Sequence, residues 1–462
     1  MNNIETFERL ESNVRMYCRD LPLVFDTAQG SRIRGEDGRE YLDFFAGAGA
    51  LNYGHNDPRM RDALIAYLSA NGVTHALDLH TTTKRQFLEA IERDLFKPRG
   101  WDYKVQFTGP TGADAVEAAL KLARKATGRT KVVSFYGAYH GMTAGALAVT
   151  GNRTRRGPGL STDVVFVPYE DSPYGEFDSI GFLERLANDQ GSGSELPAAV
   201  IVESVQIQAG VYPASNQWLQ RLRKWTTDHG VLLICDEIQA GCGRTGDFFG
   251  FERSGVVPDL ITCAKSIGGF GLPMAIVLLR AGLDVWQPGD HIGTFRGNQL
   301  AFLTARIALS YWHDEQFLKL LADNCAAMER AVAGFAEIPG VASARCRGMI
   351  AGIDFGRGNV EVAKDAQQRV LQAGVLVDRC GPNGEIIKLM PPLNTPTDQL
   401  EDGLRAFGES GRGSAGRIAA RVTLRPVLKR RPETCWTSAR TIIRRPRACV
   451  NTMMKASSSK CP

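Results

Sequence analysis

The stretch Val231-Leu232-Leu233-Ile234-Cys235-Asp236 decides the fold class of this chain of 462 residues. An apolar run that ends in an acid is typical of a buried strand in a parallel sheet. The same form recurs at Leu260-Ile261-Thr262-Cys263-Ala264-Lys265, where a lysine follows the run. We expect both strands to end at one edge of the sheet, with Asp236 and Lys265 close together.

Other short runs rich in β-branched residues occur along the chain, with helical patterns between most of them. They are residues 132–135, 164–167 and 199–202. This alternation predicts an α/β fold with a largely parallel sheet, helices on both faces and ligands at the carboxyl ends of the strands. We expect residues 56–304 to form a large domain. Residues 1–55 and 305–409 are expected to form a second, smaller domain.

Asp236 and Lys265 together indicate a pyridoxal phosphate site. A buried carboxylate is costly unless a cation meets it, and a protonated pyridine nitrogen is such a cation. A lysine at the end of the next strand can bond covalently to the cofactor aldehyde. A solvated lysine is the alternative, but the glycine-rich loop that follows Lys265 allows close backbone approach and is not typical of an exposed lysine helix.

The segment Gly109-Pro110-Thr111-Gly112-Ala113-Asp114 is a candidate phosphate site. Thr111 is a good N-cap with Asp114 three residues on, and a helix is predicted over residues 115–125. Glu117 and Lys121 are spaced for an ion pair along it. The helix start offers amides, a hydroxyl and the positive end of the helix dipole to an anion. Most capped helices bind nothing, so this motif gains weight only beside Asp236 and Lys265.

Four more residues are candidates for the same site. Tyr139 supplies a flat ring after a strand and is followed by His140; Glu203 ends a strand, and Gln239 lies three residues past Asp236. A ring can stack on a flat cofactor. Taken singly, each of these side chains is more often exposed at the surface, or buried with its hydrogen bonds made within the protein, than part of a cofactor site.

Composition indicates the compartment and the partners. The chain is 44% apolar, its first residues show no basic and apolar leader, and no run approaches ~18 apolar residues. We therefore expect a cytoplasmic protein without membrane contact. Ten cysteines without paired short spacings indicate reduced thiols and no metal site.

Residues 410–462 differ from the rest of the chain. They hold thirteen Lys and Arg against the single acid Glu433, within a net charge of +5 for the whole chain. We expect this segment to be disordered. It can serve as an arm for nucleic acid or an acidic partner. We favour the alternative that a shifted reading frame has replaced a terminal helix here, because the helical pattern of residues 397–407 stops abruptly; nucleic acid is then not an expected partner.

Together these motifs resemble the class III, or omega, aminotransferases. The resemblance covers about residues 15 to 407 and rests on Asp236-Glu237-Ile238-Gln239-Ala240-Gly241-Cys242-Gly243-Arg244-Thr245-Gly246, Pro258-Asp259 and Ala264-Lys265-Ser266. It implies the type I fold of pyridoxal phosphate enzymes, similar to aspartate aminotransferase, with a mainly parallel seven-stranded sheet and a smaller α+β domain. It also implies a homodimer or a dimer of dimers.

The resemblance implies a role for each matching residue. Lys265 carries the cofactor and moves protons, and Asp236 holds the pyridine nitrogen. Tyr139 stacks on the ring, beside His140 and Glu203, and Gln239 contacts the phenolic oxygen. The phosphate contacts are Thr111, Gly112 and Ala113, with Thr294 of the partner subunit.

Residues 44–55, 104–112 and 293–298 resemble the diaminobutyrate-forming branch of this family more closely. That branch implies transfer of the amino group of L-glutamate to L-aspartate 4-semialdehyde. The products are L-2,4-diaminobutyrate, used in ectoine and siderophore pathways, and 2-oxoglutarate.

The substrate region departs from the family pattern. Many members have Glu-x-x-Gln-Gly-Glu, whereas Ile207 and Gln208 end the motif here, and Lys388 stands where an arginine usually pairs with the second acid. We expect Gln208 and Lys388 to bind substrate, with the lysine acting as a point charge on a carboxylate. Met142 replaces an arginine of ornithine-type relatives, which argues against ornithine. The alternatives are an omega-aminotransferase for 4-aminobutyrate, ornithine or a polyamine, and a pyridoxal phosphate protein without catalytic activity.

Overall fold

The computed structural model describes residues 4–156, 163–170 and 177–422 of the chain. The residues up to Ala420 pack as one compact unit, which is described below. Most of the predicted tail, residues 423–462, lies outside the described residues.

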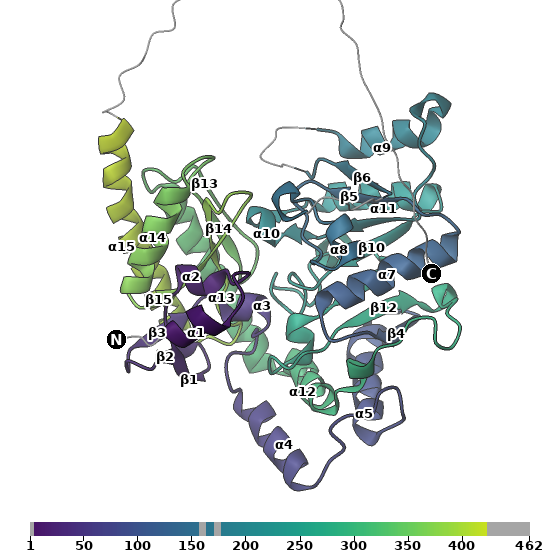
Figure 1. Ribbon diagram of the computed structural model, residues 1–462, viewed down its shortest axis with the longest axis horizontal. Coiled ribbons are helices and arrows are strands. Elements are labelled where there is room, and N and C mark those ends of the chain that lie inside the picture. Colours follow the sequence, from purple (N-terminus) through teal and green to yellow (C-terminus); the bar gives the residue numbers. More distant parts are fainter. Residues whose placement is uncertain (1–3, 157–162, 171–176, 423–462) are drawn as a thin grey trace, which may run out of the picture. The chain divides into compact units, whose positions relative to one another are not determined.

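A seven-stranded sheet forms the centre of one half of this unit (Figure 1). The strands pair in the order β4-β12-β11-β10-β7-β5-β6, and only β12 runs against its neighbours. The prediction of a mainly parallel sheet is therefore confirmed. The strands are β4 (Tyr103–Phe107), β5 (Val132–Phe135), β6 (Val164–Val167), β7 (Ala199–Val202), β10 (Leu232–Asp236), β11 (Leu260–Cys263) and β12 (Ile276–Arg280).

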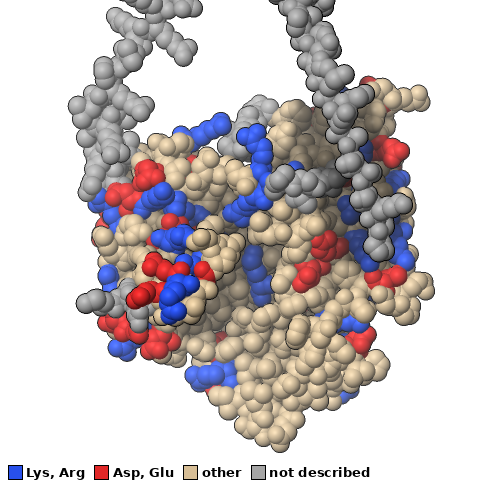
Figure 2. All heavy atoms as spheres, viewed as in Figure 1, with Lys and Arg blue, Asp and Glu red and all other residues tan. Residues whose placement is uncertain are grey.

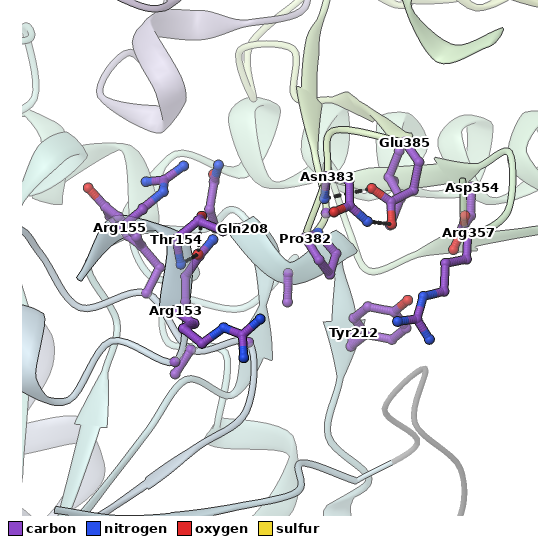
Figure 3. A pocket seen from close by; sticks show the side chains of 18 residues that line it. Arg153, Thr154, Arg155, Gln208, Tyr212, Asp354, Arg357, Pro382, Asn383 and Glu385 are labelled. Atoms are coloured by element: carbon purple, nitrogen blue, oxygen red, sulfur yellow. Dashed lines mark hydrogen bonds between the residues drawn. The ribbon is translucent and has the colours of Figure 1, made fainter. Parts of the chain in front are cut away.

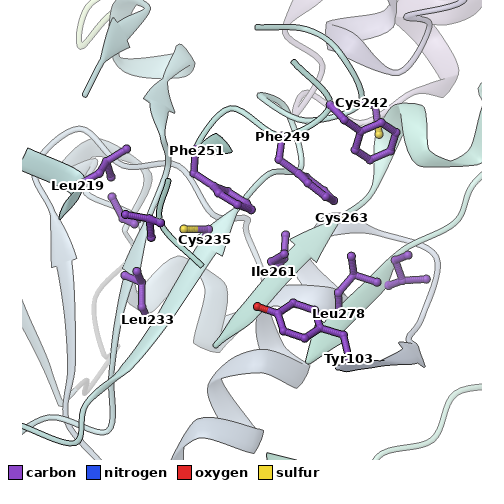
Figure 4. Close-up of a cluster of buried hydrophobic side chains, with 14 of the residues drawn as sticks. Tyr103, Leu219, Leu233, Cys235, Cys242, Phe249, Phe251, Ile261, Cys263 and Leu278 are labelled. Carbon is purple, nitrogen blue, oxygen red and sulfur yellow. The ribbon is translucent and has the colours of Figure 1, made fainter. Parts of the chain in front are cut away.

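Side chains alternate between two apolar cores on the two faces of this sheet. In β10, Ile234 packs against α7 (Gly112–Thr127), whereas Leu233 and Cys235 point to the opposite core with α11 (Asn216–Asp228). Figure 4 shows part of that second core, where Phe249 and Phe251 lie over the sheet. Burying both faces explains why the strands read as continuous apolar runs in the sequence, without polar alternation.

The second half of the unit combines segments from both ends of the sequence (Figure 1, purple and green). An antiparallel sheet of order β13-β14-β17-β16 lies beside a sheet of order β1-β2-β3-β15, in which the C-terminal β15 pairs with the N-terminal β3. The strands are β1 (Phe25–Gln29), β2 (Arg32–Gly35), β3 (Glu40–Asp43), β13 (Ser343–Cys346), β14 (Ala351–Asp354), β15 (Val375–Leu376), β16 (Asp378–Cys380) and β17 (Ile386–Leu389).

Two helices extend across the segment boundaries that were predicted from the sequence. Helix α12 (Gln299–Ser310) crosses the boundary at residue 304, and its residues enter the cores of both halves. Helix α15 (Thr397–Val422) continues past residue 410, although its apolar pattern ends at Phe407. Its continuation is compatible with the sequence because no proline occurs before Pro426.

The remaining helices connect or cover these sheets. None of the helices in the described part of the chain is long and apolar enough to cross a membrane. The α-helices not yet given are α1 (Glu5–Leu10), α2 (Tyr17–Asp20), α3 (Ala46–Gly49), α4 (Pro58–Ser69), α5 (Thr82–Ile91), α6 (Lys97–Arg99), α8 (Ala144–Ala148), α9 (Ser179–Asn188), α10 (Ile207–Gly210), α13 (Glu315–Ala336) and α14 (Val360–Gln372).

Candidate active site

Asp236 stands at the carboxyl end of β10 with its carboxylate buried. One oxygen, Oδ2, lies 2.6 Å from Nδ1 of the buried His140, and the other accepts the amide N–H of Ile238 at 3.1 Å. Burial alone would lower the pKa of His140, but the hydrogen bond and the charge of Asp236 outweigh it, so the pKa is raised. The carboxylate is thus fixed in place by the protein while facing a cavity.

Lys265 follows β11, the strand beside β10, and lies half-buried in the same cavity. Its backbone has a φ of +53°, in the left-handed region that residues with side chains rarely adopt. Burial lowers the pKa of Lys265 to about 8, partly opposed by the charge of Asp236. An amine with that pKa is neutral in about a tenth of the molecules at pH 7, far more than a free lysine, so it can act as a nucleophile or base.

The start of α7 forms one wall of the cavity. Thr111 is its N-cap: the hydroxyl accepts the amide N–H of Asp114 at 3.3 Å, and a carboxylate oxygen of Asp114 accepts the amide N–H of Thr111 at 3.1 Å. The amides of Gly112 and Ala113 follow in the first turn. A Cβ atom on Gly112 would lie 2.9 Å from the side chain of Ile238, so a larger residue here would require that side chain to move.

Tyr139 and Glu203 are joined across the cavity wall. The amide N–H of Tyr139 donates to Oε1 of Glu203 at 2.9 Å. Glu203 is buried, which raises its pKa to about 7 despite the nearby charge of His140. Gln239 turns its side-chain amide toward the carbonyl oxygen of Ala48, 2.8 Å away.

The structure brings nine of the predicted residues around one cavity of about 410 Å³. These residues are Thr111, Gly112, Ala113, Tyr139, His140, Glu203, Asp236, Gln239 and Lys265. A cavity of this size accommodates a small cofactor with substrate.

Thr294, Gln208 and Lys388 do not line this cavity. Thr294 is exposed at the start of a short turn, Thr294–Gly297. Gln208 lines a second cavity, which adjoins the first at Tyr139.

Lys388 is only 1% exposed and has two partners, Gln208, which the motif predicts, and Asp378, which it does not. Its Nζ lies 3.0 Å from Oδ2 of Asp378 and donates to Oε1 of Gln208 at 3.3 Å. Burial lowers the pKa of Lys388, but the charge of Asp378 outweighs this and the pKa is raised. Asp378 and Lys388 are direct cross-strand neighbours in the β16–β17 ladder, a register that the sequence does not reveal.

The departure at Ile207 is accommodated by packing. Ile207 is fully buried in an apolar cluster with Val205, Val211, Ala240, Ile350 and Met390. The side chain that replaces the usual glycine therefore fills the core behind the site and leaves the cavity open.

Comparisons with known proteins agree with this geometry. Residues 16–410 match the model of the aminotransferase class-III family. The diaminobutyrate–2-oxoglutarate transaminase of Halalkalibacterium halodurans is 48% identical over 415 residues, which are 88% of this chain and 96% of the relative. The enzyme of the same name from Nocardia farcinica is 50% identical over 409 residues, 86% of this chain and 92% of its own length.

A solved structure is similar across nearly the whole described unit. The ornithine aminotransferase of Toxoplasma gondii, whose active site is partly occupied by PLP, superimposes with a TM-score of 0.77 at 26% identity. The match covers 90% of this chain and 95% of that one. The fold, the family match and these relatives agree, and the chain belongs to the class III aminotransferases.

Proposed function

We propose that this enzyme transfers the amino group of L-glutamate to the aldehyde of L-aspartate 4-semialdehyde, giving L-2,4-diaminobutyrate and 2-oxoglutarate. Class III aminotransferases use pyridoxal phosphate as cofactor. The choice of substrates is supported by relatives of 45–50% identity that carry the name diaminobutyrate–2-oxoglutarate transaminase. The product would enter a pathway that consumes diaminobutyrate, such as ectoine or siderophore synthesis.

The observation that supports aminotransferase chemistry at this site is the buried Asp236–His140 pair, which lines one cavity with Lys265. The residues present fit pyridoxal phosphate. Asp236 would hold a proton on the pyridine nitrogen, and the amides and hydroxyl at the start of α7 would hold the phosphate. Tyr139 would stack on the ring, and Gln239 would contact its phenolic oxygen.

When bound, pyridoxal phosphate supplies an electron sink for the breaking Cα–H bond. We assign the protein's part to three side chains besides Asp236. Lys265 holds the cofactor and then, displaced by substrate, carries the proton between substrate and cofactor, for which a pKa of about 8 is suitable. His140 fixes the orientation of Asp236. Glu203 fixes the loop that carries Tyr139 through its hydrogen bond to the Tyr139 amide.

We further propose that residues 56–304 form a cofactor-binding domain and that residues 1–55 and 305–409 together form a smaller domain. We also propose that the protein is a homodimer and that both subunits contribute to the complete site. The apolar cores support the division, because most of the sheet-facing residues in one half come from positions 87–309. Exposed apolar side chains next to Thr294 support the dimer: Ile292 is 69% and Phe295 67% exposed. The mass of the protein in solution, measured by light scattering, tests the dimer.

We also place the enzyme in the cytoplasm. Within the described residues all seven cysteines are free thiols, which suits a reducing compartment.

The function is tested by two half-reactions followed with the purified full-length protein. Glutamate should convert the absorbance band of the bound cofactor, and addition of aspartate 4-semialdehyde should restore it and yield diaminobutyrate. Lys265→Ala should abolish both changes. Conversion by glutamate without restoration by the semialdehyde would reject the proposed acceptor, and a panel of 4-aminobutyrate, ornithine and polyamines would then identify the substrate.

A further inference from the structure

A second cavity of about 380 Å³ adjoins the catalytic cavity at Tyr139 (Figure 3). Its wall combines the turn Arg153–Arg155, Gln208 and Tyr212 from one half of the unit with residues 381–383, 385 and 386 from the other. Arg153 and Arg357 are exposed, so the cavity opens to solvent. Figure 2 shows Lys and Arg side chains around the hollow on this face of the molecule.

The three arginines of this cavity lack anionic partners within the described residues, whereas one of its two acids, Asp354, is paired with a cation. Asp354 lies 3.2 Å from the guanidinium of Arg345 and accepts the amide N–H of Gly356. Glu385 accepts two hydrogen bonds from Asn383. No ion pair or side-chain hydrogen bond is formed in that part of the chain by Arg153, Arg155 or Arg357. The cavity therefore offers net positive charge to an anion.

Arg155 is the arginine nearest to the catalytic residues. Its guanidinium carbon lies 5.1 Å from the centre of the Tyr139 ring. The turn that carries it is fixed by Asn152, whose side-chain oxygen accepts the amide N–H of Thr154 at 3.0 Å. In Figure 3, Arg153 and Arg155 lie on the same side as Gln208, and Arg357 lies on the opposite side beside Tyr212.

Lys388 is poorly suited to hold a substrate carboxylate alone. It is buried, lines neither cavity and is already neutralised by Asp378. Among the described residues that line the two cavities, the only Lys and Arg besides Lys265 are the three arginines of the second cavity.

The chemistry of the substrates suggests what these arginines bind. In glutamate the reacting carbon is separated from the far carboxylate by two methylene carbons. In aspartate 4-semialdehyde the aldehyde carbon is likewise separated from the carboxylate by two carbons. One carboxylate subsite at a fixed distance from the reacting carbon can therefore serve both substrates, without a charge that has to move between half-reactions.

We propose that Arg153 and Arg155 form a subsite for the carboxylate farthest from the reacting carbon, used by both the donor and the acceptor. The proposal rests on the proposed function for its substrates. Arg155 supplies the contact nearest Tyr139, because a guanidinium can bind a carboxylate through two parallel hydrogen bonds. Arg153, which is more exposed, adds charge at the entrance.

The test uses glutarate, a dicarboxylate that cannot react, binding to the full-length holoenzyme in a calorimeter. Arg155→Gln should raise the Kd of glutarate about tenfold, a change of about 1.4 kcal/mol, and the double variant with Arg153→Gln should raise it further. Arg155→Lys keeps the charge but loses the planar fork, so its Kd for glutarate should lie between those of the parent enzyme and Arg155→Gln. Arg357→Gln removes the same charge from the opposite side of the cavity and should raise the Kd much less than Arg155→Gln does.

A kinetic measurement separates binding from chemistry. Because the far carboxylate is held equally in the ground and transition states, Arg155→Gln should raise the KM for glutamate while the limiting rate of its half-reaction stays near that of the parent enzyme. A glutarate Kd and a glutamate KM that are both unchanged in the double variant would overturn the proposal. Neither measurement requires the aldehyde, so failure of the semialdehyde as acceptor would be recognised separately.

Discussion

Glu237, next to Asp236, is a buried acid that catalysis does not use. Its carboxylate accepts the hydroxyl of Ser204 and the amide N–H of Gly250, both at 2.7 Å. Burial raises the pKa of Glu237 from 4.5 to about 8 in spite of these bonds. Below pH 4.5 the folded and unfolded chains both keep the proton. Between pH 4.5 and 8 only the folded chain keeps it, so the contribution of Glu237 to stability falls as pH rises, by about 1.4 kcal/mol per unit.

Glu237→Gln removes this titration and should therefore change how the melting temperature depends on pH. At pH 5 the variant and the parent both carry a largely neutral side chain, and their Tm values should be similar. From pH 5 to 8 the Tm of the variant should rise relative to the parent, measured by calorimetry at saturating cofactor. Glu89, an exposed acid on α5, provides the control: Glu89→Gln should follow the parent. Parallel curves for Glu237→Gln and the parent would contradict the assigned pKa.

Residues with a local signature could be predicted from the sequence, and those defined by register could not. Asp236 and Lys265 were found because each follows a strand, and the strands proved to be neighbours. Asp378 was missed because its partner Lys388 is ten positions away, and only the antiparallel pairing of β16 with β17 brings them together. Arg155 was missed because the turn that aims it toward Tyr139 has no recognisable pattern.

Helix α7 also has features that the local sequence predicts and one that tertiary contacts decide. Its cap at Thr111 was predicted from local sequence and confirmed, and the helix ends at Gly128, which has a φ of +70°. The predicted pair of Glu117 with Lys121 was wrong. Glu117 instead accepts hydrogen bonds from the hydroxyl of Thr143 and the amide of Gly145, at 2.6 and 2.7 Å. An exposed pair along a helix contributes only about 0.2–0.5 kcal/mol, so a fixed tertiary partner prevails.

The cap of α7 gives a prediction that separates stability from cofactor binding. Thr111→Ala should cost about 1 kcal/mol of stability through loss of the cap. It should also raise the Kd of pyridoxal phosphate about tenfold, since a hydrogen bond to a charged group contributes about 1.5–3 kcal/mol. Cofactor binding to the cofactor-free protein is measured by fluorescence quenching.

Thr81 supplies the matched control because it caps α5 in the same way, accepting the amide N–H of Lys84 at 3.1 Å. Thr81 does not line the catalytic cavity. Thr81→Ala should lower the Tm at least as much, because the Thr81 hydroxyl also donates to Oε1 of the buried Gln299, and it should leave the cofactor Kd unchanged. An equal loss of cofactor affinity in both variants would mean that Thr111 acts through helix stability alone.

At the scale of the whole molecule, the fold class was predictable because strand and helix patterns alternate over most of the chain. The assembly of the smaller half was harder to derive in detail. It depends on the pairing of β15 with β3, residues that lie more than 300 positions apart in the sequence. No local pattern specifies such a contact, so this pairing was not predicted from the sequence.

The last helix sets the point at which the chain can be shortened. Leu400, Leu404 and Phe407 of α15 are buried in the core of the smaller half, and the ring of Phe407 lies 4.9 Å from that of Phe335. Beyond Val422 the sequence is basic and contains four prolines.

We therefore expect a chain that stops at Val422 to keep the kcat and the Tm of the full-length enzyme. A chain that stops at Pro396 loses three large core side chains, each contributing about 2–5 kcal/mol. Their sum rivals the whole stability of about 5–15 kcal/mol that is typical of a folded protein, so this chain should not fold. Both predictions are checked by measuring circular dichroism and the glutamate half-reaction on the two truncated chains. A large loss of activity on stopping at Val422 would show that the basic segment acts in the enzyme and is not a dispensable extension.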